Sequence, residues 1–435
     1  MSPPAADLPG GWSGAAGAEG DLWADDLAPP DDAILTRAAA AGTPLYLYDL
    51  RRVAARAARL RTAFRGRLGL SFAVKANPNP TLLRALADMV DTLDVSSGGE
   101  LAQAAAAGWD AGRTSFTGPA KRAPEIGAAL AAGLGELVVE SLAEARMADA
   151  AAAGLGLRQK VVARIAPDRV PKGFGDQMAG RPSPFGIDAE EAADTLAQIA
   201  ALRNLRLAGL HFYSGTQCLR ADAVVENWRI FIGLARDLAP MCADGPLRLI
   251  LGAGLGIPYH LTDTPLDLQA IADDIAPDLD ALAAEGRFAR PLLELGRYLV
   301  GPAGWFLTRV VAVKQSRGQR IALCDGGMNA HLAASGHFGM VIHRNYRLHL
   351  VGGAGEVEPV NLTGPLCTSI DRLAQGAMLP RVEPGALIAI HMSGAYGPTT
   401  SPVNFISHPI PREAVVDAEG RIVAADWLPQ RAGVE

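Results

Sequence analysis

The stretch that decides the fold begins with Leu70-Ser-Phe-Ala-Val-Lys-Ala-Asn77. An alanine- and leucine-rich run follows at 81–89, then a short apolar run at 92–95 and a second alanine-rich run at 99–107. Short apolar runs are typical of strands buried on both faces, and the longer runs between them are typical of helices. The stretch therefore predicts a βαβ unit, in which two parallel strands flank a helix.

The same alternation recurs along the chain. Further strand-like runs occupy 115–117, 136–140, 160–165, 207–212, 248–251 and 291–295, and each except the last is followed by a helix-like segment. About eight such units within ~250 residues favour a (β/α)₈ barrel over an open Rossmann sheet. Functional side chains are then expected directly after strands, at one end of the barrel.

Beyond Gly296 the pattern changes. Short apolar runs interrupted by glycine and proline occupy 310–313, 320–323, 347–351, 386–390 and 404–406. This pattern predicts an all-β second domain. We therefore expect a flexible N-terminal segment at 1–42, a barrel at 43–295 and a C-terminal β domain at 296–435, which the early strand at 45–48 is expected to join.

The composition argues against several classes of protein. The net charge of -6, with 20% charged residues, disfavours a nucleic-acid surface. No apolar run reaches the ~20 residues that cross a bilayer, and the charged start of a signal peptide is missing because the first basic residue is Arg37. The four cysteines form no C-x-x-C pair, so we expect neither a disulfide framework nor a metal site. A cytoplasmic protein with no membrane or nucleic-acid partner is expected.

Lys75 closes an apolar run that Asn77-Pro78 ends, which places its amine where water is scarce. An isolated lysine after a strand is ordinarily a solvated strand end, but such an amine can also form an imine with an aldehyde cofactor. The stretch resembles the Y-A-x-K-A-N motif of the fold-type III pyridoxal-phosphate decarboxylases, the group of diaminopimelate, ornithine and arginine decarboxylases. In that family the lysine holds pyridoxal 5'-phosphate as an internal aldimine. The resemblance implies a barrel of the alanine-racemase type.

Gly252-Ala-Gly-Leu-Gly256 follows an apolar run and could offer backbone N–H donors to a phosphate, or form a plain tight turn. It has neither the G-x-G-x-x-G order nor a Walker lysine, which weakens a reading as an NAD or ATP site. The run is similar to the family's G-G-G-x-x-x-P phosphate loop, with Ala253 in place of the middle glycine. The resemblance thus implies phosphate binding by Gly252, Gly254 and Gly256.

His211-Phe-Tyr-Ser214 is similar to the family's H-x-G-S segment, with Tyr213 where glycine is usual. A lone histidine after a strand is more often structural. The resemblance implies instead that His211 stacks on the pyridine ring and that Ser214 helps to bind the phosphate. Tyr213 implies a different backbone or pocket shape at this point.

Glu294-Leu-Gly-Arg297 resembles the family's E-P-G-R, with Leu295 in place of proline. A carboxylate beside the pyridine nitrogen favours the protonated ring, which then accepts electrons from Cα. Alanine racemases, which share the fold, have arginine there, so Glu294 favours decarboxylation; a surface Glu–Arg pair is the alternative. The resemblance gives Arg297 a contact with the cofactor phosphate or a substrate carboxylate.

Further matches imply more cofactor contacts. Asp94 and Glu100 match the family's D-x-x-S-x-x-E, and Arg164 matches an arginine near the phenolic oxygen of the cofactor. Each of these three also fits a helix cap or a surface charge. Tyr396 lies in Gly394-Ala-Tyr396, which resembles the family's G-A-Y element, and the resemblance implies that it reaches the cofactor phosphate.

Leu366-Cys-Thr-Ser-Ile-Asp371 carries the last part of the resemblance. Cys367 and Asp371 correspond to residues that enter the site from the other subunit, where the cysteine protonates the quinonoid carbon after carbon dioxide leaves. A buried structural cysteine is the alternative. The resemblance implies a homodimer with shared active sites.

The substrate is less defined. Diaminopimelate decarboxylases usually have glutamate directly after the cysteine, but here Thr368 cannot pair with a distal ammonium. The segments 172–180, 184–188, 331–339 and 344–346 resemble a subgroup that includes the butirosin-type decarboxylase of glutamyl-carrier-protein thioesters and exosortase-associated decarboxylases. We therefore expect decarboxylation of an amino acid or amino-acyl derivative that is acyl-linked or otherwise modified, and an acyl-carrier protein that bears it is one candidate partner. The expected substrate-binding residues are Arg297, Arg344, Tyr346, Thr368 and Asp371.

Two alternatives stay open. Asp371 could pair with the distal amine of free ornithine or lysine, and free diaminopimelate is a further candidate. An inactive decarboxylase-like protein that binds and regulates another protein is the alternative of a different class, although Lys75, Glu294 and Cys367 together argue against it.

Overall fold

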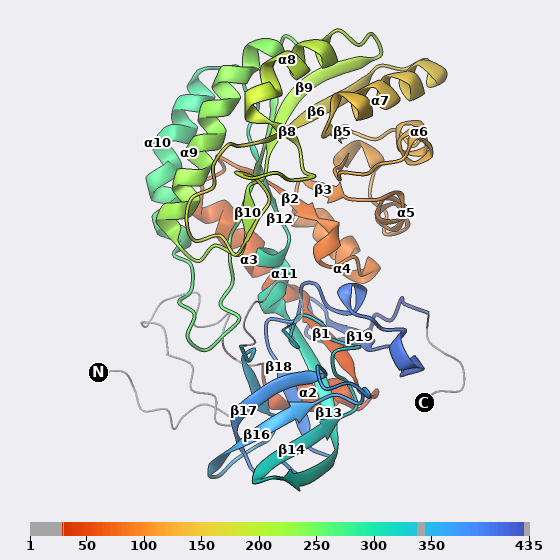
Figure 1. Ribbon diagram of the computed structural model, residues 1–435, viewed down its shortest axis with the longest axis vertical. Coiled ribbons are helices and arrows are strands. Elements are labelled where there is room, and N and C mark those ends of the chain that lie inside the picture. Colours follow the sequence, from red (N-terminus) through yellow and green to blue (C-terminus); the bar gives the residue numbers. More distant parts are fainter. Residues whose placement is uncertain (1–27, 29, 337–343, 430–435) are drawn as a thin grey trace. The chain divides into compact units, whose positions relative to one another are not determined.

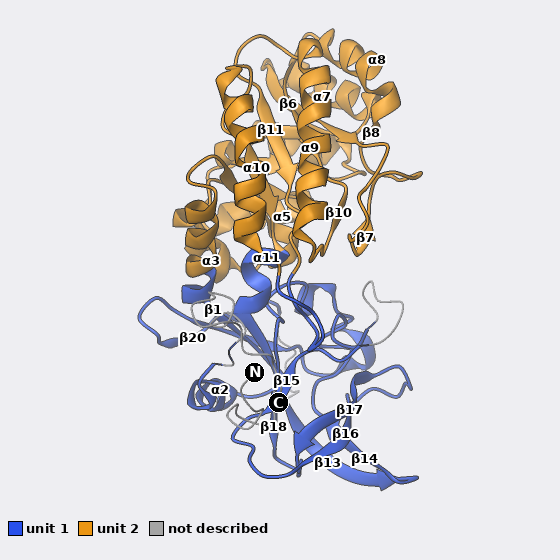
Figure 2. Cartoon of the chain, turned by 90° about the vertical axis from the view of Figure 1, so that its left-hand side faces the viewer, with its two compact units in different colours: residues 1–53, 257–265, 297–435 blue, residues 54–256, 266–296 orange. Residues whose placement is uncertain are grey.

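The structure is a computed structural model that describes residues 28, 30–336 and 344–429. The chain divides into two compact units, shown in different colours in Figure 2. Unit 1 comprises residues 1–53, 257–265 and 297–435, and unit 2 comprises residues 54–256 and 266–296. The segment 257–265, which the sequence analysis placed in the barrel, belongs to unit 1.

Unit 2 contains a closed barrel of parallel strands (Figure 1). Its strands are β2 (Gly69–Ala73), β3 (Thr92–Val95), β4 (Thr114–Phe116), β5 (Glu136–Val139), β6 (Gln159–Ala166), β9 (Leu205–Phe212), β11 (Arg248–Gly252) and β12 (Leu292–Leu295). Each strand pairs with the next, and β12 pairs with β2 from Leu292–Gly69 to Leu295–Phe72, which closes the barrel. The predicted (β/α)₈ barrel is confirmed.

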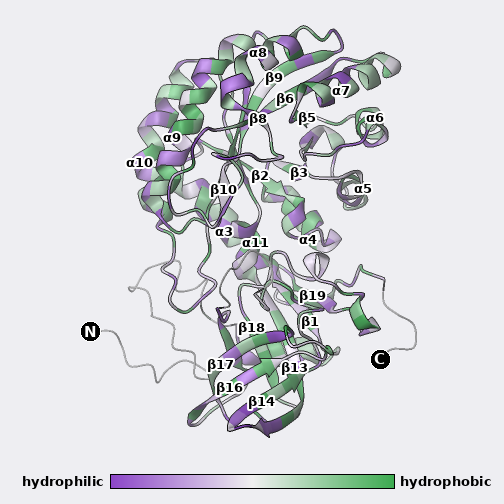
Figure 3. Ribbon diagram, viewed as in Figure 1, coloured by the Kyte–Doolittle hydropathy of each residue, from purple (hydrophilic) through white to green (hydrophobic). Residues whose placement is uncertain are grey.

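Helices alternate with these strands. They are α3 (Leu50–Ala63), α4 (Pro80–Ala85), α5 (Gly98–Ala106), α6 (Ala123–Ala131), α7 (Leu142–Leu155), α8 (Ala189–Ala200), α9 (Ala221–Leu238) and α10 (Leu268–Ala284). Side chains cap several of them: the Ser97 hydroxyl accepts the N–H of Glu100 at 3.1 Å, and Ser141 caps α7 in the same way. Figure 3 shows hydrophilic and hydrophobic residues alternating along α9, whose apolar face buries Val224, Trp228 and Phe231.

Two short strand pairs extend from the barrel. β7 (Asp176–Gln177) pairs with β10 (Gly215–Thr216), and β8 (Ile187–Asp188) pairs with the end of β6. β7 and β8 lie within the segment 172–188, which the sequence analysis singled out. This segment is therefore tied to the chain that follows β9 and to β6.

Unit 1 is built on a β sheet, as predicted (Figure 1). Its strands are β1 (Leu45–Asp49), β13 (Gly304–Ser316), β14 (Gln319–Cys324), β15 (Leu348–Leu350), β16 (Val357–Thr363), β17 (Arg372–Pro380), β18 (Leu387–Ile390), β19 (Arg412–Val416) and β20 (Ile422–Ala424). β1 runs antiparallel to β13 and parallel to β19. The early strand thus lies inside the sheet of this unit.

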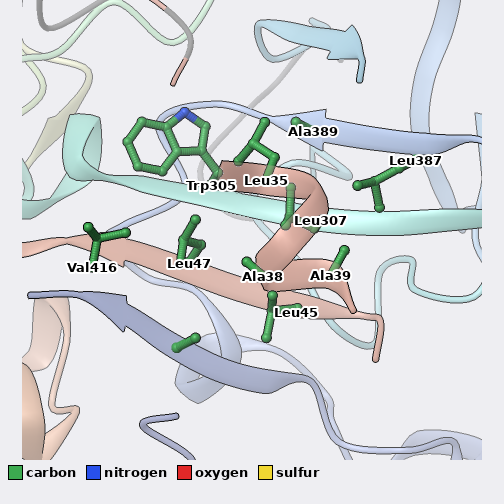
Figure 4. Packing of buried hydrophobic residues seen from close by; sticks show 11 residues of the cluster. Leu35, Ala38, Ala39, Leu45, Leu47, Trp305, Leu307, Leu387, Ala389 and Val416 are labelled. Carbon is green, nitrogen blue, oxygen red and sulfur yellow. The ribbon is translucent and has the colours of Figure 1, made fainter. Parts of the chain in front are cut away.

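Helix α2 (Asp32–Ala39) packs on this sheet. Figure 4 shows Leu35 and Ala38 beside Leu45, Leu307 and the Trp305 ring in one buried cluster. Burying a leucine fully contributes ~1.5–3 kcal/mol, which holds the helix in place. The segment 1–42, expected to be flexible, therefore contains an ordered helix, while residues 1–27 and 29 lie outside the described part of the chain.

One strand prediction was wrong. Residues 404–406 were expected to form a strand, but Phe405–Ser407 form a 3-10 turn in which Ile406 has φ 55. Prolines at 402, 409 and 411 flank the turn and remove backbone N–H donors that a strand ladder needs. The strands β16 and β17 were missed because their buried residues are interspersed with exposed polar ones.

Within the described residues, no helix is long and apolar enough to cross a membrane. Among the same residues, no group of three histidine, cysteine or acidic side chains is placed to hold a metal ion.

Candidate active site

The predicted cofactor residues of unit 2 come from neighbouring barrel strands. Asp94 lies in β3, Arg164 in β6, His211 in β9 and Glu294 in β12. Lys75 lies in a 3-10 turn, Val74–Ala76, directly after β2, so the strand ends one residue earlier than predicted. Because parallel strands of a barrel end at the same mouth, these side chains gather at one end.

Glu294 and His211 form a buried pair. The Nε2 atom of His211 lies 3.0 Å from Oε2 of Glu294, and the two residues are 1% and 3% exposed. Burial alone would raise the pKa of Glu294, but His211, Lys75 and Arg164 outweigh it and lower that pKa to about 2. Glu294 is therefore a buried carboxylate that stays ionised at neutral pH.

Asp94 differs from Glu294 in that its pKa is raised, not lowered. Its Oδ1 accepts hydrogen bonds from the hydroxyls of Ser115 at 2.8 Å and Thr117 at 2.5 Å. Burial and the charge of Glu294 raise the pKa of Asp94 to about 8, although Lys75 and the two hydroxyls act in the other direction. Two carboxyl groups in one site thus differ in charge at neutral pH, and Ser115 and Thr117 were missed by the sequence analysis.

Lys75 interacts electrostatically with these acids, but its side chain is exposed, so the prediction that its amine lies where water is scarce is wrong. Its charge lowers the pKa of Asp94, of Glu294 and of Glu100, although burial leaves the pKa of Glu100 raised overall. Glu100 Oε2 accepts the Ser96 N–H at 2.6 Å, which fixes the start of α5. Glu100 therefore fixes the backbone at the start of α5 and also interacts electrostatically with Lys75.

Arg164 is fixed by a residue that the sequence analysis missed. Its Nη1 atom donates to both carboxylate oxygens of Glu140 at 3.1 Å. Glu140 also accepts the N–H groups of Gly118 and Gly186, each at 2.9 Å. Glu140 directly follows β5, as a functional residue of a barrel should, and that position was the available signal. The guanidinium lies 4.9 Å from the centre of the Phe185 ring.

The glycine loop after β11 is closely packed. A Cβ atom at Gly252 would lie 2.3 Å from Cδ2 of Tyr213, and one at Gly254 would lie 2.5 Å from Cε1 of Phe174. Gly254 also has φ 67, in the left-handed region that favours glycine. The N–H of Gly256 donates to the carbonyl of Cys218 at 2.8 Å, so this group already serves the turn.

The barrel mouth fits the cofactor that the resemblance implies. Within the described residues, the buried polar atoms without a hydrogen-bond partner include three at this mouth: Nδ1 of His211, Oδ2 of Asp94 and Oγ of Ser214. Buried polar atoms are normally satisfied, so such a set at one mouth indicates a bound polar group. Ser214 directly precedes Gly215, whose carbonyl lies 3.3 Å from where a Cβ of Gly254 would be, so the backbone that follows Ser214 lies against the glycine loop. An anionic aromatic group suits this arrangement.

Unit 1 groups a second set of predicted residues around Arg297, at the start of α11 (Arg297–Val300). Its Nη1 atom donates to the Tyr259 hydroxyl at 2.6 Å, and its guanidinium lies 4.6 Å from the centre of the Tyr396 ring. Tyr346 packs on Tyr259 with ring centres 4.7 Å apart. Burial would lower the pKa of Arg297, but Tyr259 and Tyr396 raise it overall. Tyr259 was missed, although it follows the glycine loop closely.

Arg344 is exposed and already paired. Its Nη2 atom donates to the hydroxyl of Thr262 at 2.6 Å and to Oδ1 of Asp263 at 2.7 Å. Residues 337–339 of the segment 331–339, which carried part of the resemblance, lie outside the described part of the chain. The structure therefore gives Arg344 a role in joining 344–346 to 262–263.

Asp371 organises the loop that carries Cys367. Its Oδ1 accepts the Met328 N–H at 2.6 Å, and its Oδ2 accepts the Leu366 N–H at 2.8 Å. Cys367 is exposed, in contrast to the buried cysteine of the alternative interpretation, and Thr368 is half-buried. Asp371 thus uses both oxygens to hold backbone around the exposed thiol.

Comparisons with known proteins identify the family of the chain. The family model described as "Pyridoxal-dependent decarboxylase, pyridoxal binding domain" matches residues 50–301. The L-glutamyl-[BtrI acyl-carrier protein] decarboxylase of Niallia circulans is 32% identical over 381 residues, which cover 85% of this chain and 88% of that protein. A diaminopimelate decarboxylase of Helicobacter pylori is 31% identical, with 82% and 86% covered. The crystal structure of Helicobacter pylori diaminopimelate decarboxylase complexed with L-lysine matches with a TM-score of 0.79 and 29% identity, over 90% of this chain and 95% of that one. This chain belongs to the pyridoxal-dependent decarboxylase family.

Proposed function

We propose that this enzyme removes the α-carboxylate of an amino acid carried on an acyl-carrier protein. The observation that carries the decarboxylase chemistry is the convergence of Lys75, the ionised Glu294 and the neutral Asp94 at one barrel mouth. Pyridoxal 5'-phosphate, when bound, withdraws electrons from Cα of the substrate and so permits the carboxylate to leave as carbon dioxide.

Each residue of the mouth has a proposed part. Lys75 would hold the cofactor covalently, Glu294 would pair with its ring nitrogen, and His211 would lie against its ring. Ser214, Gly252 and Gly254 would hold the phosphate, with Gly256 fixing the turn. Arg164, Asp94 and Glu100 would contact or support the rest of the ring, and Glu140 would hold Arg164. In unit 1, Arg297 and Tyr396 would bind the phosphate or a substrate carboxylate.

The electrostatics support this assignment. A carboxylate whose pKa is about 2 keeps its charge when a partner nitrogen carries a proton, so Glu294 would stabilise that proton. Asp94, with a pKa of about 8, adds no second negative charge at neutral pH. Of these two acids, only Glu294 therefore carries a negative charge at neutral pH. That charge would pair with the one protonated ring nitrogen of the cofactor.

Cys367 is the proposed acid that returns a proton to Cα. Because the thiol is exposed, a second copy of the chain could receive it into its own site. Asp371 holds the loop in the conformation that presents it. We therefore propose a homodimer in which each site combines one copy's Lys75 with the other copy's Cys367.

The carrier-linked substrate rests on two observations. The relative at 32% identity acts on an L-glutamyl group attached to a carrier protein. Among the residues predicted to bind substrate, none offers an unengaged acid: Asp371 uses both oxygens, and Thr368 is neutral. Among these residues a distal ammonium would therefore have no free carboxylate as partner, whereas an amide- or thioester-linked side chain needs none.

A direct assay tests the proposal. Purified enzyme loaded with pyridoxal phosphate is offered a glutamyl-carrier-protein thioester, free glutamate, free diaminopimelate, free ornithine and free lysine in turn, and carbon dioxide release is followed. The thioester should be turned over with the highest kcat/KM. Turnover of free diaminopimelate in preference to the thioester would favour the second candidate, which the Helicobacter pylori relative at 31% identity supports.

A further inference from the structure

Tyr213 is the clearest departure from the family pattern that the structure places at the barrel mouth. It directly follows β9 and is half-buried. The Nζ atom of Lys75 lies 5.8 Å from the centre of its ring, and the guanidinium carbon of Arg164 lies 5.9 Å from it. Both distances fall within the ~6 Å over which an aromatic face attracts a cation.

The surroundings of the ring leave it little freedom. Gly252 packs against one edge so closely that a Cβ there would meet Cδ2 at 2.3 Å and Cγ at 2.9 Å. The carbonyl of Phe212 lies 2.9 Å from the same point, so no side chain fits between the ring and the loop. The ring is therefore held by backbone on the loop side.

Arg164 is fixed beside the Tyr213 ring by contacts with other residues. It donates to both oxygens of Glu140 and lies 4.9 Å from the centre of the Phe185 ring. Phe185 and Tyr213 thus both lie within cation–π distance of one guanidinium, and Tyr213 also lies within that distance of Lys75. A row of contacts therefore connects the buried ion pair of Arg164 and Glu140 to Lys75 through the ring of Tyr213.

We propose that Tyr213 is a positioning residue for Lys75, and that its ring face holds the amine when the amine is a free ammonium. A lysine side chain has four carbons and many rotamers, so an attractive face reduces the arrangements open to Nζ. The proposed contact is with the face of the ring, so it does not require the hydroxyl. The inference rests on the proposed role of Lys75, but its test does not require activity.

The test compares the reactivity of the Lys75 amine in full-length variants freed of cofactor. Each is treated with limiting acetic anhydride at fixed pH, and acetylation of Lys75 is quantified by mass spectrometry relative to exposed Lys160 and Lys314. Only the neutral amine reacts, so loss of a face that favours the ammonium should raise the rate. We expect Tyr213→Leu to label about two- to fivefold faster than the wild type, and Tyr213→Phe to label at the wild-type rate.

A series of side chains of similar shape at position 213 controls for variants that fail to fold. Phenylalanines with increasing numbers of ring fluorines keep the size of the side chain at position 213 but weaken the negative charge of its face. Labelling of Lys75 should rise step by step along this series. An unchanged rate across the series, or a Tyr213→Phe variant that labels like Tyr213→Leu, would overturn the proposal.

Turnover gives an independent measure. In the cofactor-loaded enzyme, Tyr213→Leu should lower kcat several-fold with little change in KM, and Tyr213→Phe should restore it. Failure of the proposed role of Lys75 would look different, because Lys75→Ala would then keep its turnover whatever the labelling experiment showed.

Discussion

His211 Nε2 lies 3.0 Å from Glu294 Oε2 in a part of the barrel that is almost fully buried. The pair joins β9 to β12, two strands that do not neighbour each other in the sheet, because β11 runs between them. A charge-assisted contact across a barrel mouth restrains both side chains. It also explains why a carboxylate can stay ionised so far from water.

Glu294→Gln should remove the charge while keeping the shape of the side chain. We expect kcat for carbon dioxide release to fall about 10²–10³-fold, since the variant lacks the buried charge that would stabilise a protonated ring nitrogen. Steady-state kinetics with the preferred substrate measures this. Circular dichroism serves as the control for folding, and a folded variant with wild-type kcat would refute the role of Glu294.

Asp94→Asn should change how stability depends on pH. The folded-state pKa of Asp94, about 8, lies above the unfolded value of ~3.9, so its contribution is fully present below the unfolded value and is lost as pH rises to about 8. Asparagine does not ionise, so the variant does not lose this stability as pH rises. The melting temperature of the cofactor-free variant should therefore fall less between pH 5 and pH 8 than that of the wild type, by about 2–4 °C for each kcal/mol.

Glu294 acts in a separate pH window, so the two acids can be told apart. Its lowered pKa means that its contribution is present above ~4.3 and is lost as pH falls to about 2. Identical pH profiles for Asp94→Asn and the wild type above pH 5 would contradict the neutral state of Asp94.

Glu140→Gln should destabilise the barrel. The change leaves the Arg164 guanidinium buried without its carboxylate, and breaking a buried ion pair in this way costs about 3–5 kcal/mol. Denaturant unfolding of the cofactor-free protein measures the loss. Glu226→Gln, at an exposed position on α9, is the matched control and should change the free energy of unfolding by less than about 0.5 kcal/mol.

The shared-site dimer predicts complementation between two inactive variants. Lys75→Ala and Cys367→Ala should each have little activity alone. When the two are mixed and allowed to exchange subunits, half of the dimers are hybrids, and each hybrid holds one intact site, so about a quarter of wild-type activity should return. Sites built from one copy alone would leave the mixture inactive.

The sequence predicted those features that depend on local pattern. The barrel strands could be recognised because each is a short apolar run. Lys75, Asp94, His211 and Glu294 were singled out by short motifs that resemble those of the family, because their positions alone also fit structural residues. Thr117, Glu140 and Tyr259 were missed because their contacts join residues that are far apart in sequence. The turn at Ile406 was misread as a strand because the apolar run outweighed the flanking prolines in the prediction.

Lys75 is the amine that we propose holds pyridoxal phosphate, and the proposed function depends on it. Borohydride reduction of the cofactor-loaded enzyme, followed by peptide mapping, measures this directly. The label should lie on the peptide that contains Lys75 and should be absent from Lys75→Ala. A label on another lysine, with position 75 unmodified, would contradict it.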